Sequence, residues 1–306
     1  MKHSPDMEII VWILLFFVLV LPAVFYLVSI AANGLHGNLG RIRSSSGPLC
    51  FGLVRGWCNA AWATVLMAAT YPLQRVLARR GSTTKEPETG SAAPVVLVHG
   101  LYHNHAAWWL FGRWLAGLGY GNLYTAAYGS FTREFPEAVQ VVGRVVERAL
   151  AENPGRKVLL CGHSLGGLVI RALLADERFR GRVAAVATLG TPHHGSLLGF
   201  VALGRLGRSL RPGSSMLQRL DALPELEDVP RLSFYTPLDN MVMPESCLRV
   251  GRPGWKEDLL PLKVSHVGMI YHRPLAFRVA AFFRTVEAGA AWQFQPSQTA
   301  ESAERT

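Results

Sequence analysis

The chain has 306 residues, half of them hydrophobic, and carries a formal net charge of +10. That length fits one large domain with additions, or two small domains, and it allows a sizeable core without disulfide bonds. The basic residues are scattered and form no long run, which argues against nucleic-acid binding and favours contact with anionic lipid headgroups. The four cysteines show no C-x-x-C spacing, so they predict neither a disulfide framework nor a zinc site.

Residues 9–32 form an apolar run without any charged side chain. About 20 apolar residues suffice for a helix that crosses a bilayer, so we predict a transmembrane anchor over residues 1–33. The alternative is a cleaved signal peptide, because residues 29–31 read S-I-A and fit a small-x-small cleavage site. The apolar core of a signal peptide normally spans about 7–15 residues, and the longer run here favours an uncleaved anchor.

Residues 34–93 are predicted to form a juxtamembrane segment and a linker. Within them, residues 57–72 are a second apolar stretch, which is short and mixed in polarity. These properties favour an interfacial or core-packing helix over a second crossing. Residues 81–93 are small and polar, as linkers are. Basic residues are more frequent after the anchor than before it, so the positive-inside rule favours a cytoplasmic catalytic part.

Short apolar strand patterns alternate with helix patterns over residues 94–290. This alternation predicts an α/β domain with a mostly parallel sheet and helices on both faces. Residues 196–228 interrupt the alternation and are predicted to be a functional insertion, and residues 291–306 are predicted to be a disordered tail. The predicted strands are 95–98, 123–128, 158–161, 183–189, 232–235 and 259–264, and the predicted helices are 106–118, 136–151, 165–174 and 274–286.

The sequence G-H-S-L-G at residues 162–166 is a G-x-S-x-G motif between a predicted strand and a predicted helix. A sharp turn there strains the serine backbone and requires small neighbours, which glycine provides. The turn exposes the hydroxyl of Ser164 above the sheet, where the first amides of the helix stabilise negative charge. The alternative is that Ser164 only caps the helix, but the strand and helix around it favour a nucleophile.

A serine nucleophile needs a base, and the base needs an acid that orients it. In this architecture the chain order is serine, acid, histidine, and the groups gather at the carboxyl ends of strands. Asp239 and His266 each follow a predicted strand, so we predict a triad of Ser164, Asp239 and His266. Chain order and strand context favour this set over other acids and bases. Those alternatives are Asp221, Asp228, Asp258, His193, His194 and His272.

Two backbone N–H groups are predicted to form an oxyanion hole, that of Leu101 after the first strand and that of Leu165 beside the nucleophile. Gly100 lets the first loop come close, although an ordinary strand-end turn is the alternative. The side chain of His163 is expected to pack beside the site. The residues expected to line the substrate side are His99, Gly100, Tyr102 and His163.

Five stretches together resemble the bacterial triacylglycerol lipases of the α/β-hydrolase superfamily, and especially a membrane-anchored, lipase-like group. The resemblance covers residues 94–286. It implies the α/β-hydrolase fold and a serine hydrolase that acts on carboxylic esters through the same three residues. The stretches are V-V-L-V-H-G-L at 95–101, G-H-S-L-G-G at 162–167, T-L-G-T-P-H-H-G-S at 188–196, D-N-M-V-M-P at 239–244 and S-H-V-G-M at 265–269.

The resemblance also implies that the chain from Ser196 onward forms a lid over an acyl-binding cleft. Some secreted relatives bind a structural calcium ion, but no acidic cluster supports one here, so neither a metal nor another cofactor is predicted. Several apolar residues fit the underside of a lid, with plain core packing as the alternative. These residues are Leu197, Leu198, Phe200, Val201 and Leu203.

These observations predict an enzyme that cleaves carboxylic esters of lipids, with a lipid or ester substrate and the membrane as its partners. One alternative is a phospholipase or acyltransferase that acts on membrane lipids. Another is a catalytically silent, membrane-anchored binding module. The silent module is less favoured, because each predicted triad member and both glycines of the motif are present.

Overall fold

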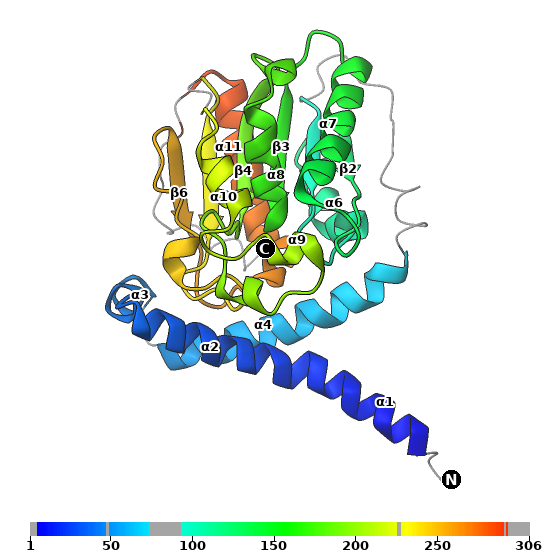
Figure 1. The fold of residues 1–306 in the computed structure, drawn as a ribbon. Helices are drawn as coiled ribbons and strands as arrows, with labels where there is room; N and C mark the ends of the chain where they lie inside the picture. Colours follow the sequence, from blue (N-terminus) through cyan, green and yellow to red (C-terminus); the bar gives the residue numbers. More distant parts are fainter. Residues whose placement is uncertain (1–4, 47–48, 74–92, 225–227, 291, 293–306) are drawn as a thin grey trace.

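The fold is known from a computed structural model, shown in Figure 1. Nearly all of the predicted linker at 81–93 and of the predicted tail at 291–306 lies outside the described residues. The residues described are 5–46, 49–73, 93–224, 228–290 and 292.

Within these residues, one sheet contains β1 (Val95–Val98), β2 (Leu123–Ala126), β3 (Val158–His163), β4 (Val183–Leu189), β5 (Arg231–Tyr235) and β6 (Trp255–Leu259). Every strand runs parallel to its neighbours, in the order β2-β1-β3-β4-β5-β6. β2 is added on one side of β1, whereas β3 and the later strands are added on the other side, so the order of the strands reverses between β1 and β3. The carboxyl ends of the strands at such a reversal are where open α/β sheets bind ligands.

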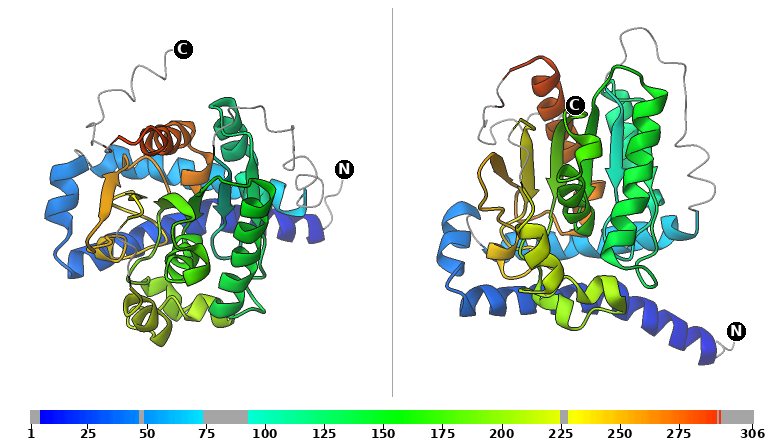
Figure 2. Two further views of the ribbon diagram at one scale, coloured as in Figure 1. Left: turned by 90° about the horizontal axis from the view of Figure 1, so that it is seen from above. Right: turned by 45° about the horizontal axis from the view of Figure 1, so that its top comes forward.

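Helices cover both faces of the sheet, as Figure 2 shows. One face carries a pair of packed helices, α7 (Phe135–Glu152) and α8 (Leu165–Leu174). The other face carries α6 (Trp109–Gly117) and α11 (Arg273–Glu287), which also pack on each other. The predicted architecture, a mostly parallel sheet with helices on both faces, is confirmed.

Strand β1 shows how the sheet divides the core in two. Val96 and Val98 belong to the core beneath α7 and α8, whereas Val95 and Leu97 belong to the core beneath α6 and α11. Successive residues of a strand point to opposite faces, so a strand covered on both faces must be apolar throughout. This burial explains why the central strands were recognisable as uninterrupted apolar runs.

The last strand differs from its prediction. Strand β6 reads W-K-E-D-L, and the strand expected at 259–264 is wrong because residues 260–264 lie in the loop that follows. β6 lies at the edge of the sheet, where strands tolerate charged residues that discourage further pairing. The apolar pattern that suggested a strand comes from loop side chains that are buried, namely Leu260, Leu262 and Val264.

The N-terminal part of the chain is helical. Among the residues that the structure describes, two stretches, Asp6–Leu35 and Leu49–Thr70, are long and apolar enough to cross a membrane, by length and composition alone. A signal sequence would pass the same test for the first of them. Both stretches cross below the sheet in Figure 1. The helices are α1 (Pro5–Leu15), the π-helical η1 (Phe16–Val20), α2 (Leu21–Leu35), α3 (Leu39–Ser46) and α4 (Leu49–Thr70).

The inserted segment contains η5 (Leu197–Phe200), α9 (Gly204–Arg208) and α10 (Ser215–Asp221). Residues of α10 join the core beneath α8, whereas Phe200, Val201 and Leu203 are exposed and Leu197 and Leu198 are half-buried. Plain core packing is therefore wrong for these five apolar residues. The remaining short helices are η2 (Tyr71–Leu73), η3 (His105–Trp108), η4 (Glu177–Phe179), η6 (Glu245–Cys247) and η7 (Val267–Tyr271).

Candidate active site

Ser164 lies in a sharp turn between β3 and α8, with a φ of 54° and a ψ of −124°. A positive φ is uncommon for a residue other than glycine and marks local backbone strain. The turn is crowded, because a Cβ on Gly166 would lie 2.2 Å from the carbonyl oxygen of Val98. Ser164 occupies the N-cap position of α8, yet its side chain makes no capping hydrogen bond. The alternative role as a helix cap is therefore wrong.

Backbone and side-chain hydrogen bonds hold this turn against the end of β4. The N–H of Ser164 donates to the carbonyl oxygen of Leu189 at 2.8 Å. The carbonyl oxygen of Ser164 accepts the hydroxyl of Thr191 at 3.0 Å. These bonds at both ends of the residue fix the direction in which its side chain leaves the backbone.

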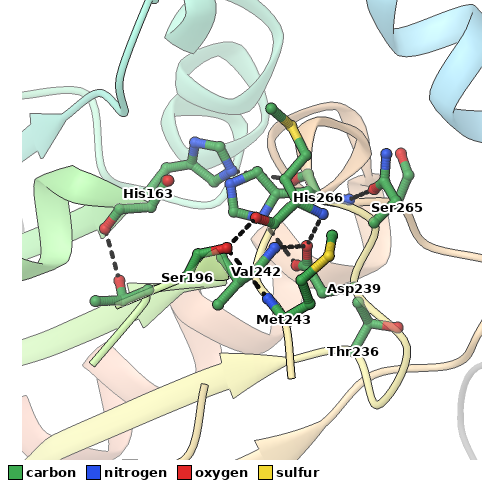
Figure 3. A network of polar contacts seen from close by, with 12 residues as sticks. His163, Ser196, Thr236, Asp239, Val242, Met243, Ser265 and His266 are labelled. Carbon is green, nitrogen blue, oxygen red and sulfur yellow. Dashed lines mark hydrogen bonds and ion pairs between the residues drawn. The ribbon is translucent and has the colours of Figure 1, made fainter. Parts of the chain in front are cut away.

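His266 and Asp239 form a buried pair, shown in Figure 3. The Nδ1 of His266 lies 2.8 Å from Oδ2 of Asp239. The other carboxylate oxygen of Asp239 accepts the backbone N–H groups of Met241 at 2.7 Å and Val242 at 2.8 Å. With Nδ1–H directed at the carboxylate, Nε2 of His266 is the nitrogen left to accept a proton. The pair therefore has the arrangement of a base and the acid that orients it.

His266 lies against His163, the residue before Ser164, and close to the end of β4. The ring of His163 donates from Nε2 to the carbonyl oxygen of His266 at 3.0 Å, and the two rings are 4.8 Å apart. A Cβ on Gly190, the residue after Leu189, would lie 3.1 Å from Nδ1 of His266. The residue before Ser164 and the residue after Leu189 thus both lie close to His266. The ring of His163 therefore packs beside that of His266 and is held by the backbone of the same residue.

The alternative acids and bases lie in other surroundings. Asp221 on α10 pairs with Arg171 at 2.9 Å, and Asp258 lies inside β6 and pairs with Arg278. His193 is buried and its Nε2 lies 3.2 Å from the hydroxyl of Ser233. The other three are placed differently: Asp228 and His194 are exposed, and His272 precedes α11.

The loop after β1 comes close to the nucleophile. A Cβ on Gly100 would lie 2.8 Å from the Cβ of Ser164, so only glycine permits this approach. Tyr102 also has a positive φ, of 59°, and its N–H donates to the hydroxyl of Ser130 at 2.8 Å. The predicted oxyanion donors, the N–H groups of Leu101 and Leu165, belong to this loop and to the first residue of α8.

His99 differs from its expected place on the substrate side. Its ring is buried and stacks on Tyr128 with centroids 4.3 Å apart. Nδ1 lies 2.8 Å from the carbonyl oxygen of Gly100, and Nε2 accepts the N–H of Tyr128 at 3.4 Å. Both ring nitrogens are therefore used within the fold, and His99 braces the loop. Burial lowers its pKa to about 4, so the ring is uncharged at neutral pH.

Several residues of the site were given no individual role from the sequence, although Asn240 and Ser196 lie in stretches that carry the lipase resemblance. Asn240 accepts the backbone N–H of His266 on its Oδ1 at 3.0 Å. Ser196, at the start of the insertion, donates its hydroxyl to the carbonyl oxygen of Met241 at 2.7 Å (Figure 3). Ser29 and Asn59, from the N-terminal helices, reach the loops that carry Asp239 and His266. Each of these contacts joins distant parts of the chain or depends on the conformation of a loop. Residue type alone predicts neither a distant contact nor a loop conformation.

No group of three or more potential metal ligands from histidine, cysteine, aspartate and glutamate occurs in the part of the chain that the structure describes. The chemistry available at this site is that of a serine, an imidazole, a carboxylate and backbone amides. This set suits nucleophilic attack on a carbonyl carbon followed by stabilisation of the oxyanion.

Residues 95–300 match the alpha/beta hydrolase family, and the chain belongs to that family. The mature form of a Bacillus licheniformis lipase has a similar structure, with a TM-score of 0.56 and 20% sequence identity over 67% of this chain and 96% of that one. Aspergillus fumigatus lipase B is similar with a TM-score of 0.54 and 15% identity over 64% of this chain and 53% of that one. At these identities the likeness concerns the fold.

A curated relative matches a shorter segment. GPI inositol-deacylase of Candida albicans is 43% identical over 42 residues, which are 14% of this chain and 11% of that protein. The chain thus aligns with only a small part of this relative. The family and the fold agree with the lipase resemblance seen in the sequence motifs.

Proposed function

We propose that the protein is a serine hydrolase that cleaves carboxylic esters of lipids through an acyl-enzyme. The observation that carries this proposal is the strained turn at Ser164 beside the buried His266–Asp239 pair. Ester cleavage requires a serine whose hydroxyl is free of helix capping and an imidazole that is held in place nearby. Both lie at the same edge of a parallel sheet here.

The reaction begins when Ser164 attacks the ester carbonyl carbon and His266 takes the hydroxyl proton on Nε2. Asp239 holds the ring through Nδ1 and stabilises the positive charge that forms. The N–H groups of Leu101 and Leu165 receive the oxyanion, and each such donor contributes about 3 kcal/mol to transition-state stabilisation in related enzymes. His266 then protonates the leaving alcohol, and water, activated by the same imidazole, releases the acid.

A lipid substrate is supported by the surroundings of the site. Two apolar helical stretches lie at the edge of the sheet where the site is found, and either is long enough to cross a bilayer. We place the protein at a membrane, anchored by its N-terminal helices, with the catalytic domain over residues 94–290. One relative is named a deacylase and two structural neighbours are named lipases, and these names agree with a lipid substrate.

The test uses the full-length protein in detergent with p-nitrophenyl butyrate, and a panel of labelled triglyceride and phospholipid. Ser164→Ala is expected to lower turnover of every cleaved substrate by at least about a thousandfold, because the nucleophile is lost. Ser44→Ala, on the exposed side of α3, is the matched control and should keep the wild-type rate. Wild-type turnover in Ser164→Ala would contradict the proposal, and the products of the panel define the lipid class.

A further inference from the structure

Helix α2 presents to the hydrolase domain a buried stripe that includes polar side chains. Pro22, Tyr26, Ser29 and Asn33 are buried, at the helical spacing that places residues on one face. Ser29 is 0% and Asn33 is 1% exposed, although much of the helix surface is apolar and exposed. Buried polar groups require hydrogen-bond partners. Ser29 and Asn33 find such partners in loops that follow the strands of the sheet.

Ser29 holds the loop that carries the acid. Its hydroxyl donates to the backbone carbonyl oxygen of Asp239 at 2.6 Å. That carbonyl belongs to the peptide between Asp239 and Asn240, and both side chains hold His266. Asp239 bonds the ring at Nδ1, and Asn240 accepts the backbone N–H. One hydroxyl from α2 therefore fixes the peptide from which both supports of His266 extend.

Asn59, on α4, holds the loop that carries the base. Its Oδ1 accepts the backbone N–H and the hydroxyl of Ser265, each at 2.8 Å. The hydroxyl oxygen of Ser265 in turn accepts the N–H of Gly268 at 3.1 Å. These bonds enclose His266, which lies between the two residues in the chain. A single amide oxygen of α4 thereby sets the conformation of the loop around the imidazole.

Close packing between α4 and this loop supports the contact. A Cβ on Gly56 would lie 2.9 Å from the carbonyl oxygen of Leu262, and one on Gly268 would lie 1.8 Å from Oδ1 of Asn59. The helix and the loop are therefore in direct contact on both sides of Ser265. A third tether joins α2 to η6, where Asn33 accepts the N–H of Glu245 at 2.8 Å.

We propose that Ser29 and Asn59 are positioning residues, which align Asp239 with His266 from the apolar helices α2 and α4. The N-terminal helices are then part of the catalytic apparatus as well as an attachment to the membrane. This inference rests on the proposed function, because it assigns the two residues a role in the chemistry of Ser164.

The test compares Ser29→Ala and Asn59→Ala in the full-length protein in detergent. Titration with a fluorophosphonate counts the reactive sites, and p-nitrophenyl butyrate gives kcat per site and KM. Because kcat is expressed per reactive site, loss of folded protein lowers the number of sites and leaves kcat per site unaffected. Ser44→Ala and Thr64→Ala are matched controls, since among the described residues these hydroxyls bond to carbonyl oxygens of their own helices.

Each of the two variants should lower kcat per site about tenfold or more, with KM within about twofold, because a small misplacement of the base slows proton transfer but leaves ester binding intact. The controls should keep the wild-type kcat. Unchanged kcat per site in both variants, or a change confined to KM, would overturn the inference alone. If the folded wild-type protein fails to react with the fluorophosphonate, that result contradicts the proposed function and therefore also this inference.

Discussion

Ser164 is held in a backbone conformation that favours glycine, with a φ of 54°. Strain of this kind persists where the surroundings determine the conformation, as the bonds from Ser164 to Leu189 and Thr191 do here. The strained conformation of Ser164 therefore lowers the stability of the fold, and it directs the hydroxyl out of the sheet. Such strain at a proposed catalytic residue has a measurable consequence for the stability of variants.

Ser164→Gly is expected to be more stable than Ser164→Ala. Glycine adopts a positive φ without strain, whereas alanine keeps the strain and loses the hydroxyl. The difference should be about 1 kcal/mol in the free energy of unfolding, after the greater entropy of unfolded glycine is subtracted. Thermal midpoints of the two variants in detergent measure it. An alanine variant as stable as the glycine variant would show that this turn carries no strain.

Asp239→Asn is expected to lower kcat about ten-thousandfold while the loop keeps its structure. An asparagine oxygen can still accept the N–H groups of Met241 and Val242, but its amide group can no longer accept the Nδ1–H of His266. The favoured tautomer of the ring is then lost. Turnover of p-nitrophenyl butyrate measures the effect, and a variant with more than a tenth of the wild-type kcat would contradict the assigned role of Asp239.

Buried histidines near the site predict a loss of stability in acid. Burial lowers the pKa of His99 to about 4 and that of His103 to about 3. In the unfolded chain these groups titrate near pH 6.5. Between those values the unfolded state binds more protons, so stability falls as the pH falls, by up to about 1.4 kcal/mol per pH unit for each histidine.

The variant His103→Gln tests this dependence. Its thermal midpoint should fall less steeply than that of the wild type between pH 6.5 and 4, because one of the groups that protonate only on unfolding has been removed. Midpoints measured at half-unit steps of pH in one detergent provide the comparison. Parallel curves for the two proteins would contradict the assignment of His103 as a buried, uncharged group.

At the scale of elements, burial decides what was predictable. Strands β1, β3 and β4 are buried on both faces and read as apolar runs, and the G-x-S-x-G motif locates Ser164 between β3 and α8. Edge strand β6 was placed wrongly because its composition is polar. Chain order and the end of β5 pointed to Asp239, whereas His266 was proposed from chain order and from a strand that lies elsewhere. The supports of these two residues are set by loop conformations that residue type alone does not determine.

The insertion is joined to the loop after β1 through Tyr102. Its hydroxyl donates to the carbonyl oxygen of Leu203 and accepts the N–H of the same residue, each at 2.7 Å, while its ring stacks on Phe131. Tyr102→Phe keeps the ring and removes both hydrogen bonds. We expect faster amide hydrogen exchange across residues 197–208, because the segment then opens more easily. Unchanged exchange in that segment would contradict the role of this contact.

At the scale of the whole molecule, α2 and α4 cross the edge of the sheet where the site lies (Figures 1 and 2). Hydropathy identifies such helices in the sequence, but it does not show that they pack on the loops that carry Asp239 and His266. The bond between Ser29 and Asp239 joins residues 210 positions apart, and a contact over that separation depends on the complete fold. The N-terminal helices and the hydrolase domain are thus one packed structure.

This packing predicts that the mature protein keeps its N-terminal helix. Cleavage after residue 31 would remove Ser29 and leave the carbonyl oxygen of Asp239 without that donor. Peptides from residues 1–31 should therefore be found by mass spectrometry in the membrane fraction, in the same amount as peptides from the hydrolase domain. A fully active protein that begins at residue 32 would contradict the prediction.

The most direct measurement is to react the full-length protein with a fluorophosphonate and to map the modified residue by mass spectrometry. We expect a single adduct on Ser164, formed quickly in the wild type and far more slowly in a His266→Ala variant, which lacks the base. An unmodified Ser164 in folded wild-type protein, or equal labelling rates in the two proteins, would contradict the account.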